Sequence, residues 1–283
     1  MIRRNLCAAL TLISLAAAGV AQAQQVAITL DDLPYVLPSR TTPAEGLAQV
    51  AAINRALAEH GITATGFAVG AQLTRRSRPA LQSFADAGHT IGNHSWSHPD
   101  YGTLTIDAFR AETVRTHAAL TAWIGDGPRL YRFPFLREGE TPAAKAAADQ
   151  VLGELGYRNV PVTIDNDEWR FNADYLDALD AGDARAARQI AAAYLTHMQE
   201  RTQHFQDLAR SALDRDVAHI LLLHMNRLNA DHLDTLLAWY AAEGWTFITV
   251  EEALKDPLFE APERYTGPRG LSQIERVIGR TSD

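Results

Sequence analysis

Short apolar runs alternate with longer amphipathic stretches along most of this 283-residue chain. The predicted strands cover residues 26–30, 65–69, 90–93, 130–133, 157–160, 162–165, 219–223 and 246–249. Stretches with the spacing of an amphipathic helix separate most of them, which is typical of parallel strands joined by crossover helices. The sequence therefore predicts an α/β protein with seven or eight strands.

Capping signals mark the ends of the predicted helices. Residues 42–45 (Thr-Pro-Ala-Glu) combine an N-cap, a proline at the first helical position and a capping-box glutamate, so we expect a helix from there to His60, ended by Gly61. The other predicted helices cover residues 79–87, 106–123, 142–155 and 231–243, a late helix at the capping box 272–275, and two helices within 173–214 that are separated at 181–183. This order of elements predicts a single barrel-like domain, with a doubly wound open sheet as the alternative.

The N-terminal residues have the composition of a cleaved secretory signal. Arg3 and Arg4 precede an apolar run at residues 6–20, which ends at the small-residue site 21–23 (Ala-Gln-Ala). This run is shorter than the ~20 residues that span a bilayer. Cys7, the only cysteine, lies within it, so the mature chain would form no disulfide.

The expected organisation follows from this signal. We expect a signal peptide at residues 1–23 and one domain at residues 24–283, which includes a helical segment at 173–214 and a C-terminal tail at 256–283. The mature protein would be periplasmic or secreted, with no integral membrane span after cleavage.

The charge of the chain argues against nucleic acid as a partner. It has 34 acidic and 26 basic residues, a formal net charge of -8, and only two lysines, Lys145 and Lys255. A chain of this kind has no evident basic patch to neutralise phosphates. No feature of the sequence identifies a protein partner.

Two adjacent acids follow the first predicted strand. Asp31 and Asp32 come directly after the apolar run at residues 26–30. Because neighbouring residues of an extended chain point to opposite sides, one carboxylate could hold a metal while the other stays free for proton transfer. The alternative is a solvated turn rich in Asp before Pro34.

Two histidines follow the predicted strand at residues 90–93. His94 and His98 are four residues apart, which is metal-ligand spacing. Ser95 stands where an HExxH protease motif needs glutamate, so this is not a zincin site. Two histidines and one carboxylate would leave coordination positions open for the water of a hydrolytic site, whereas surface histidines at this spacing also arise by chance.

Further polar residues follow other predicted strands. Arg132 and Phe135 end one run, the acids at residues 165–168 precede Trp169, and His224 ends another run. His224 alone is as easily a structural residue as a catalytic one. The joint pattern favours a functional site, because the carboxyl ends of barrel strands meet at one face.

These motifs occur in the order found in the NodB-type polysaccharide deacetylases, carbohydrate esterase family 4, which the chain resembles over roughly residues 26–254. The resemblance rests on residues 29–32 (Thr-Leu-Asp-Asp), 94–98 (His-Ser-Trp-Ser-His), 132–135 (Arg-Phe-Pro-Phe) and 222–224 (Leu-Leu-His). It implies a single distorted (β/α) barrel of seven or eight units and a divalent metal, most commonly zinc. Two histidines and a carboxylate would also suit cobalt, nickel or iron.

The resemblance also implies a role for each motif residue. The metal ligands would be Asp32, His94 and His98, the general base Asp31 and the general acid His224, while Arg132 would orient Asp31, and Leu222 and Trp169 would line the acetyl pocket.

Two residues depart from the family pattern. Phe135 stands where the family usually has tyrosine; if its main-chain N–H serves the oxyanion, as in relatives, the missing phenol should matter little. Glu168 stands where the family usually has aspartate, which leaves either Glu168 or Asp165 as the partner of His224.

The expected function is the removal of acetyl groups from an N-acetylated glycan, such as peptidoglycan or a chitin-like polysaccharide, by a metal-activated water. One alternative keeps the chemistry but acts on O-acetyl esters or small acetylated amines. Another is a metal-holding glycan-binding module without turnover, because fold does not fix function.

Overall fold

The computed structural model describes residues 24–36 and 39–280, so the predicted signal peptide and Cys7 lie outside the described residues. This part of the chain forms one seven-stranded sheet in which every pairing is parallel, and it confirms the predicted α/β class. Its strands are β1 (Gln25–Leu33), β2 (Thr65–Ala68), β3 (Thr90–Asn93), β4 (Leu130–Tyr131), β5 (Arg158–Asn159), β6 (Ala218–His224) and β7 (Thr246–Ile248).

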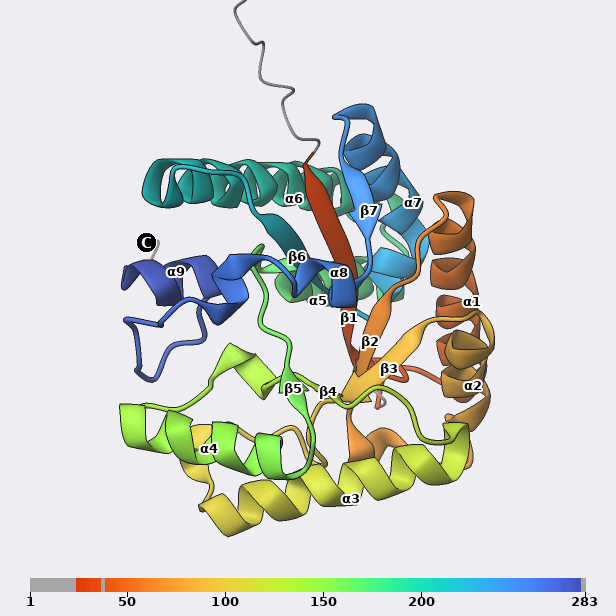
Figure 1. Ribbon diagram of the computed structural model, residues 1–283. Coiled ribbons are helices and arrows are strands. Elements are labelled where there is room, and N and C mark those ends of the chain that lie inside the picture. Colours follow the sequence, from red (N-terminus) through yellow and green to blue (C-terminus); the bar gives the residue numbers. More distant parts are fainter. Residues whose placement is uncertain (1–23, 37–38, 281–283) are drawn as a thin grey trace, which may run out of the picture.

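Strand β1 lies at the centre of the sheet (Figure 1). The strand order is β5-β4-β3-β2-β1-β6, and β7 pairs with the N-terminal part of β1. On one side β1 pairs with β6 along its length, from Gln25↔Ala218 to Asp31↔His224. This register brings an acid and a histidine directly opposite each other at the carboxyl end of the sheet.

The chain after β5 brings the two edges of the sheet together. Ile164 forms an isolated parallel bridge with Leu221, and Leu222 N–H donates to Ile164 O at 3.2 Å. The prediction of a regular strand at 162–165 is wrong, because only this single bridge forms there. The Ile220 N–H donates to the Thr163 hydroxyl at 2.8 Å and not to a main-chain carbonyl, as it would in a regular parallel pairing. The sheet therefore curls into a distorted barrel rather than the open doubly wound alternative.

Nine α-helices accompany the strands in the described residues. They are α1 (Pro43–Glu59), α2 (Arg78–Asp86), α3 (Ile106–Ile124), α4 (Pro142–Glu154), α5 (Glu168–Asp180), α6 (Ala184–Leu213), α7 (Arg227–Ala242), α8 (Val250–Ala253) and α9 (Gln273–Ile278). The capping boxes predicted at Thr42 and Ser272 are both present. Four short 3₁₀ helices also occur: η1 (Gly70–Gln72), η2 (Tyr101–Thr103), η3 (Pro134–Leu136) and η4 (Pro257–Glu260).

The helical segment at residues 173–214 packs on the same core as the sheet. The predicted break at 181–183 separates α5 from α6, the long helix in the upper part of Figure 1. Tyr194, Met198 and Phe205 of α6 are fully buried in the main apolar cluster. Helix α5 begins at Glu168, before the predicted start, so the acidic run leads into a helix and not into the end of a strand.

Within residues 24–36 and 39–280, no helix has both the length and the apolar character needed to cross a bilayer.

Candidate active site

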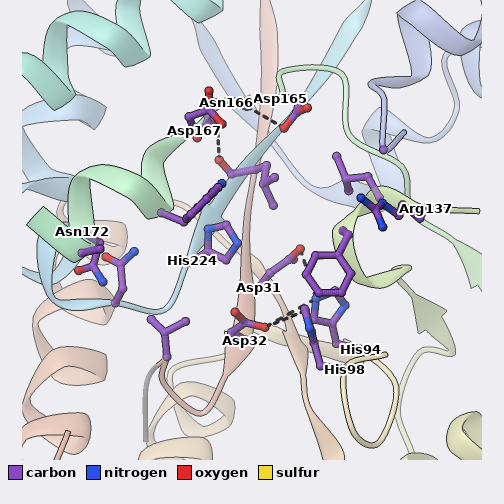
Figure 2. A pocket seen from close by; sticks show the side chains of 18 residues that line it. Asp31, Asp32, His94, His98, Arg137, Asp165, Asn166, Asp167, Asn172 and His224 are labelled. Carbon is purple, nitrogen blue, oxygen red and sulfur yellow. Dashed lines mark hydrogen bonds and ion pairs between the residues drawn. The ribbon is translucent and has the colours of Figure 1, made fainter. Parts of the chain in front are cut away.

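A cavity of about 710 Å³ lies at the carboxyl end of the central strands (Figure 2). Eight of the ten predicted site residues line it: Asp31, Asp32, His94, His98, Phe135, Trp169, Leu222 and His224. The other two, Arg132 and Glu168, lie behind the cavity wall, where they bind Asp31 and His224. The structure thus brings all of the predicted residues to one place.

The three predicted metal ligands converge from strand β1 and from the loop that follows β3. One ligand atom from each of Asp32, His94 and His98 lies within 4.8 Å of the others. The His98 Nε2 to Asp32 Oδ1 distance is 3.4 Å, and the His94 Nε2 to Asp32 Oδ1 distance is 3.8 Å. Asp32 Oδ1 is buried without a hydrogen-bond partner in the described residues, as expected for an oxygen that faces a cation.

One hydrogen bond orients His94, and burial favours a neutral His98. The main-chain carbonyl of Arg132 can only accept, so His94 Nδ1–H donates to it at 2.8 Å and Nε2 keeps its lone pair for a metal. Burial, followed by the neighbouring His94, lowers the pKa of His98 to about 4. Neutral imidazole is the form that binds a metal.

The two acids of β1 face the same cavity. The prediction that they point to opposite sides is wrong, because Asp32 adopts a left-handed conformation with φ of 63°. The pairing of β1 with β2 shifts register between Leu30 and Leu33, at the same place. Figure 2 shows Asp31 and Asp32 side by side, both turned toward the histidines.

Asp31 is held ionised by a buried arginine. Arg132 is 1% exposed, and its Nη1 donates to Asp31 Oδ1 at 2.8 Å and to Thr29 Oγ1 at 2.7 Å. Burial alone would raise the pKa of Asp31, but the charge and the hydrogen bond of Arg132 hold the pKa below its usual value. Asp31 is therefore a carboxylate at neutral pH, 3.7 Å from His94 Nε2.

His224 is paired with Glu168, which resolves the choice between Glu168 and Asp165. His224 Nδ1 lies 2.8 Å from Glu168 Oε2, and Glu168 is fully buried. Burial alone would lower the pKa of His224, but the hydrogen bond and charge of Glu168 raise it to about 9. Asp165 lines the cavity, but its carboxylate accepts the Asn166 N–H.

Two aromatic side chains are exposed at the cavity. Phe135 is 54% exposed and Trp169 is 52% exposed, although both are large and apolar. The Phe135 ring meets the His98 ring edge-on with centroids 4.6 Å apart. Leu222 also lines the cavity, with an apolar side chain that is almost fully buried. It lies two residues before His224, on the same face of β6.

Glu112 is a site residue that sequence reasoning missed. It lies on α3, and its Oε2 accepts hydrogen bonds from Ser95 Oγ, Trp96 N, Ser97 N and Ser97 Oγ. These donors all belong to the loop between the two histidines. No local sequence signal links a helical glutamate to this loop, because the contact exists only after folding.

Asn226 and Asn229 were also missed. Their side-chain amides donate to Glu168 Oε1, the carboxylate oxygen that does not bind His224. Asn229 Nδ2 donates to His224 O as well. The sequence did carry a signal for Asn226, because asparagine is a favoured N-cap residue and Asn226 is the N-cap of α7. The helix predicted to begin at residue 231 began too late to include it.

The family comparison agrees with this site. A family model described as polysaccharide deacetylase matches residues 18–160, just over half of the chain. This range contains Asp31, Asp32, His94, His98 and Arg132.

Curated relatives match at low identity. A peptidoglycan-N-acetylglucosamine deacetylase of Listeria monocytogenes is 23% identical over 237 residues, which cover 83% of this chain and 40% of the relative. A peptidoglycan-N-acetylmuramic acid deacetylase of Bacillus subtilis is 25% identical over 210 residues, which cover 73% of this chain and 66% of the relative. The chain thus spans less than half of the Listeria protein.

Solved structures share the fold. A CE4 family pseudoenzyme from Bacillus anthracis matches with a TM-score of 0.57 and 17% identity, covering 82% of this chain and 66% of that one. A family 4 carbohydrate esterase from Streptomyces lividans, solved with acetate, matches with a TM-score of 0.54 and 20% identity, covering 82% and 96%. With the family match and the barrel described above, the chain belongs to the polysaccharide deacetylase family, carbohydrate esterase family 4.

Proposed function

We propose that this protein is a metal-dependent hydrolase that removes acetyl groups from an N-acetylated glycan, such as peptidoglycan or a chitin-like polysaccharide. The observation that carries the proposal is the convergence of Asp32, His94 and His98 within 4.8 Å, with Asp31 and His224 at the same cavity. The names of the Listeria and Bacillus relatives support a peptidoglycan substrate.

The described residues fit a divalent metal. Asp32, His94 and His98 would hold it, through one carboxylate oxygen that has no other partner and two imidazoles whose free nitrogens face that oxygen. Three protein ligands leave open positions for water and substrate, as in hydrolytic zinc sites. Zinc suits this donor set best, and cobalt, nickel or iron would also fit.

A bound cation would supply Lewis acidity, which lowers the pKa of a water and polarises the acetyl carbonyl. Asp31 would act as the general base that takes the proton of this water, because its carboxylate is ionised and lies beside the ligands. Arg132 would hold Asp31 in place through the hydrogen bond to Oδ1.

His224 would act as the general acid toward the leaving nitrogen. An amine leaves poorly until it is protonated, and the raised pKa keeps His224 charged at neutral pH. The Phe135 N–H, which donates no hydrogen bond within the described residues, would stabilise the oxyanion. The rings of Phe135 and Trp169 would contact the sugar, and Leu222 with Trp169 would line the acetyl pocket.

Acetate release tests the proposal. Zinc-loaded protein is incubated with N-acetylated chito-oligosaccharides, peptidoglycan and acetylated xylan, with Asp31→Asn as the inactive control. We expect release from an N-acetylated glycan, lost in the control. Release from xylan alone would identify an ester hydrolase. No release from any substrate, with glycan binding retained, would identify a glycan-binding module without turnover.

We also propose that the protein is exported and that residues 24–283 form its mature domain. Arg3, Arg4 and the apolar run at residues 6–20 support a cleaved signal. Expression of the full chain in a bacterial host followed by mass spectrometry of the periplasmic and secreted fractions tests this. We expect a mature N-terminus at Gln24, whereas retention of Met1 in the cytoplasm would contradict export.

A further inference from the structure

The turn that carries the proposed oxyanion donor has an unusual backbone. Phe135 and Leu136 both adopt left-handed conformations, with φ of 58° and 55°, although neither is glycine. Residues in this region persist when the surrounding structure fixes them, and they concentrate at functional sites. The contacts around this turn are therefore informative.

Gly270 packs directly against the turn. A methyl group added at Gly270 would lie 1.8 Å from Phe135 O and 3.1 Å from Leu136 Cβ, so only glycine allows the two backbones to approach this closely. Gly270 also lines the cavity. It belongs to the C-terminal segment, residues 256–280, which lies beyond the range that the family model matches.

Arg276 binds the second residue of the same turn, Leu136. This arginine of α9 is 1% exposed, and its Nη2 donates to Leu136 O at 2.7 Å. The first turn of α9 is itself attached to the barrel, because Gln273 N–H donates to Val162 O at 2.7 Å. The C-terminal segment thus connects the turn to the chain that closes the barrel.

Buried charges surround the Arg276 guanidinium. Nε lies 3.7 Å from Glu138 Oε1 and Nη1 lies 3.5 Å from Glu263 Oε2, and Lys145 Nζ lies 3.2 Å from Glu138 Oε2. Glu138 is 3% exposed. A buried ionic network of this kind is weak evidence for stability but can fix one arrangement among several. Here the arrangement that it fixes includes Leu136 O.

We propose that Gly270 and Arg276 are positioning residues, through which the C-terminal segment holds the Phe135–Leu136 turn so that the Phe135 N–H points at the reacting acetyl group. The inference rests on the proposed deacetylase function. Because main-chain donors act only when correctly placed, a small displacement of this turn should slow the chemical step and leave metal binding unchanged.

Gly270→Ala is the direct test, with Gly153→Ala as the matched control. An added methyl at Gly153, in α4, meets no atom within 4 Å, and φ is not left-handed at either glycine. For zinc-loaded Gly270→Ala acting on an N-acetylated chito-oligosaccharide, we expect kcat to fall about 10- to 100-fold, with KM and zinc affinity within about twofold of wild type. Gly153→Ala should behave as wild type.

Two results would overturn the inference. One is a wild-type kcat in Gly270→Ala. The other is a fall in kcat that is accompanied by losses of zinc affinity and thermal stability. Such a result would show general damage to the protein and not displacement of a donor.

Arg276→Lys gives a test that needs no turnover. Hydrogen exchange measured by mass spectrometry should show faster exchange, by about tenfold or more, in peptides covering residues 133–137, because Leu136 N–H and Arg137 N–H close this turn. Exchange of β1 and β3 should be unchanged. Unchanged exchange at 133–137 would contradict the role of Arg276. If wild-type protein releases no acetate, the proposed function fails, while the exchange result still decides whether the turn is held.

Discussion

At the scale of single residues, the site pairs each proton-handling group with a buried partner of opposite charge. Arg132 Nη1 donates a hydrogen bond to Asp31 Oδ1 at 2.8 Å, and His224 Nδ1 lies 2.8 Å from Glu168 Oε2. The first pair lowers the pKa of the proposed base, and the second raises the pKa of the proposed acid to about 9. Both groups therefore hold their active protonation states across neutral pH.

Glu168→Gln should narrow the pH range of activity. A general acid works while it is protonated, so the rate falls as pH rises through its pKa. Without the Glu168 charge, burial of His224 is no longer outweighed and its pKa drops. We expect the alkaline limb of the kcat/KM profile to move down by about two units, and activity at pH 8 to fall about tenfold. An unmoved alkaline limb would remove His224 from the role of acid.

His94→Ala should abolish zinc binding and turnover together, because it removes one of three ligands. Equilibrium dialysis against zinc and an acetate-release assay measure the two effects. His60→Ala is the matched control, since His60 lies at the end of α1 and binds Asp234. Turnover that survives in His94→Ala would end the metal assignment.

At the scale of elements, local signals could be read from the sequence, whereas contacts between elements could not. The capping boxes at Thr42 and Ser272 use residues three apart, so the sequence alone predicts both helix starts. The left-handed Asp32 has no such signal, and it turns both acids into the cavity. The roles of Glu112 and Arg276 depend on residues distant in the chain, which no periodicity reveals.

The contact between α3 and the histidine loop leads to a prediction about metal affinity. Glu112→Gln converts a charged acceptor of four hydrogen bonds into a neutral amide. Because Ser95 and His98 of this loop have left-handed φ, the loop depends on outside support. We expect zinc affinity to fall about 10- to 100-fold, as for other residues that orient ligands.

Glu59→Gln serves as the control for this change, because Glu59 is exposed on α1. Titration of each variant with a zinc chelator gives the affinities. Equal affinities in the two variants would show that the loop keeps its shape without Glu112.

At the scale of the whole molecule, the helical segment and the barrel share one core. Met198 of α6 is fully buried in the cluster that includes residues of β1 and β6. We propose that residues 24–283 unfold as one unit. Met198→Ala should lower the free energy of unfolding by about 2–5 kcal/mol and keep a single transition in urea. Two transitions, of which only one shifts, would show that the helical segment is a separate domain.

The pairing of Asp31 with His224 has a consequence for redesign. They oppose each other on one rung of the β1–β6 ladder, so adjacent strands, about 4.8 Å apart, set the spacing of their backbones. Loops other than those at residues 94–98 and 133–137, which carry proposed ligands and the oxyanion donor, could be exchanged for those of other barrels without altering that spacing. The protein is therefore suited to loop grafting, in which new sugar preferences are selected on an unaltered reaction centre.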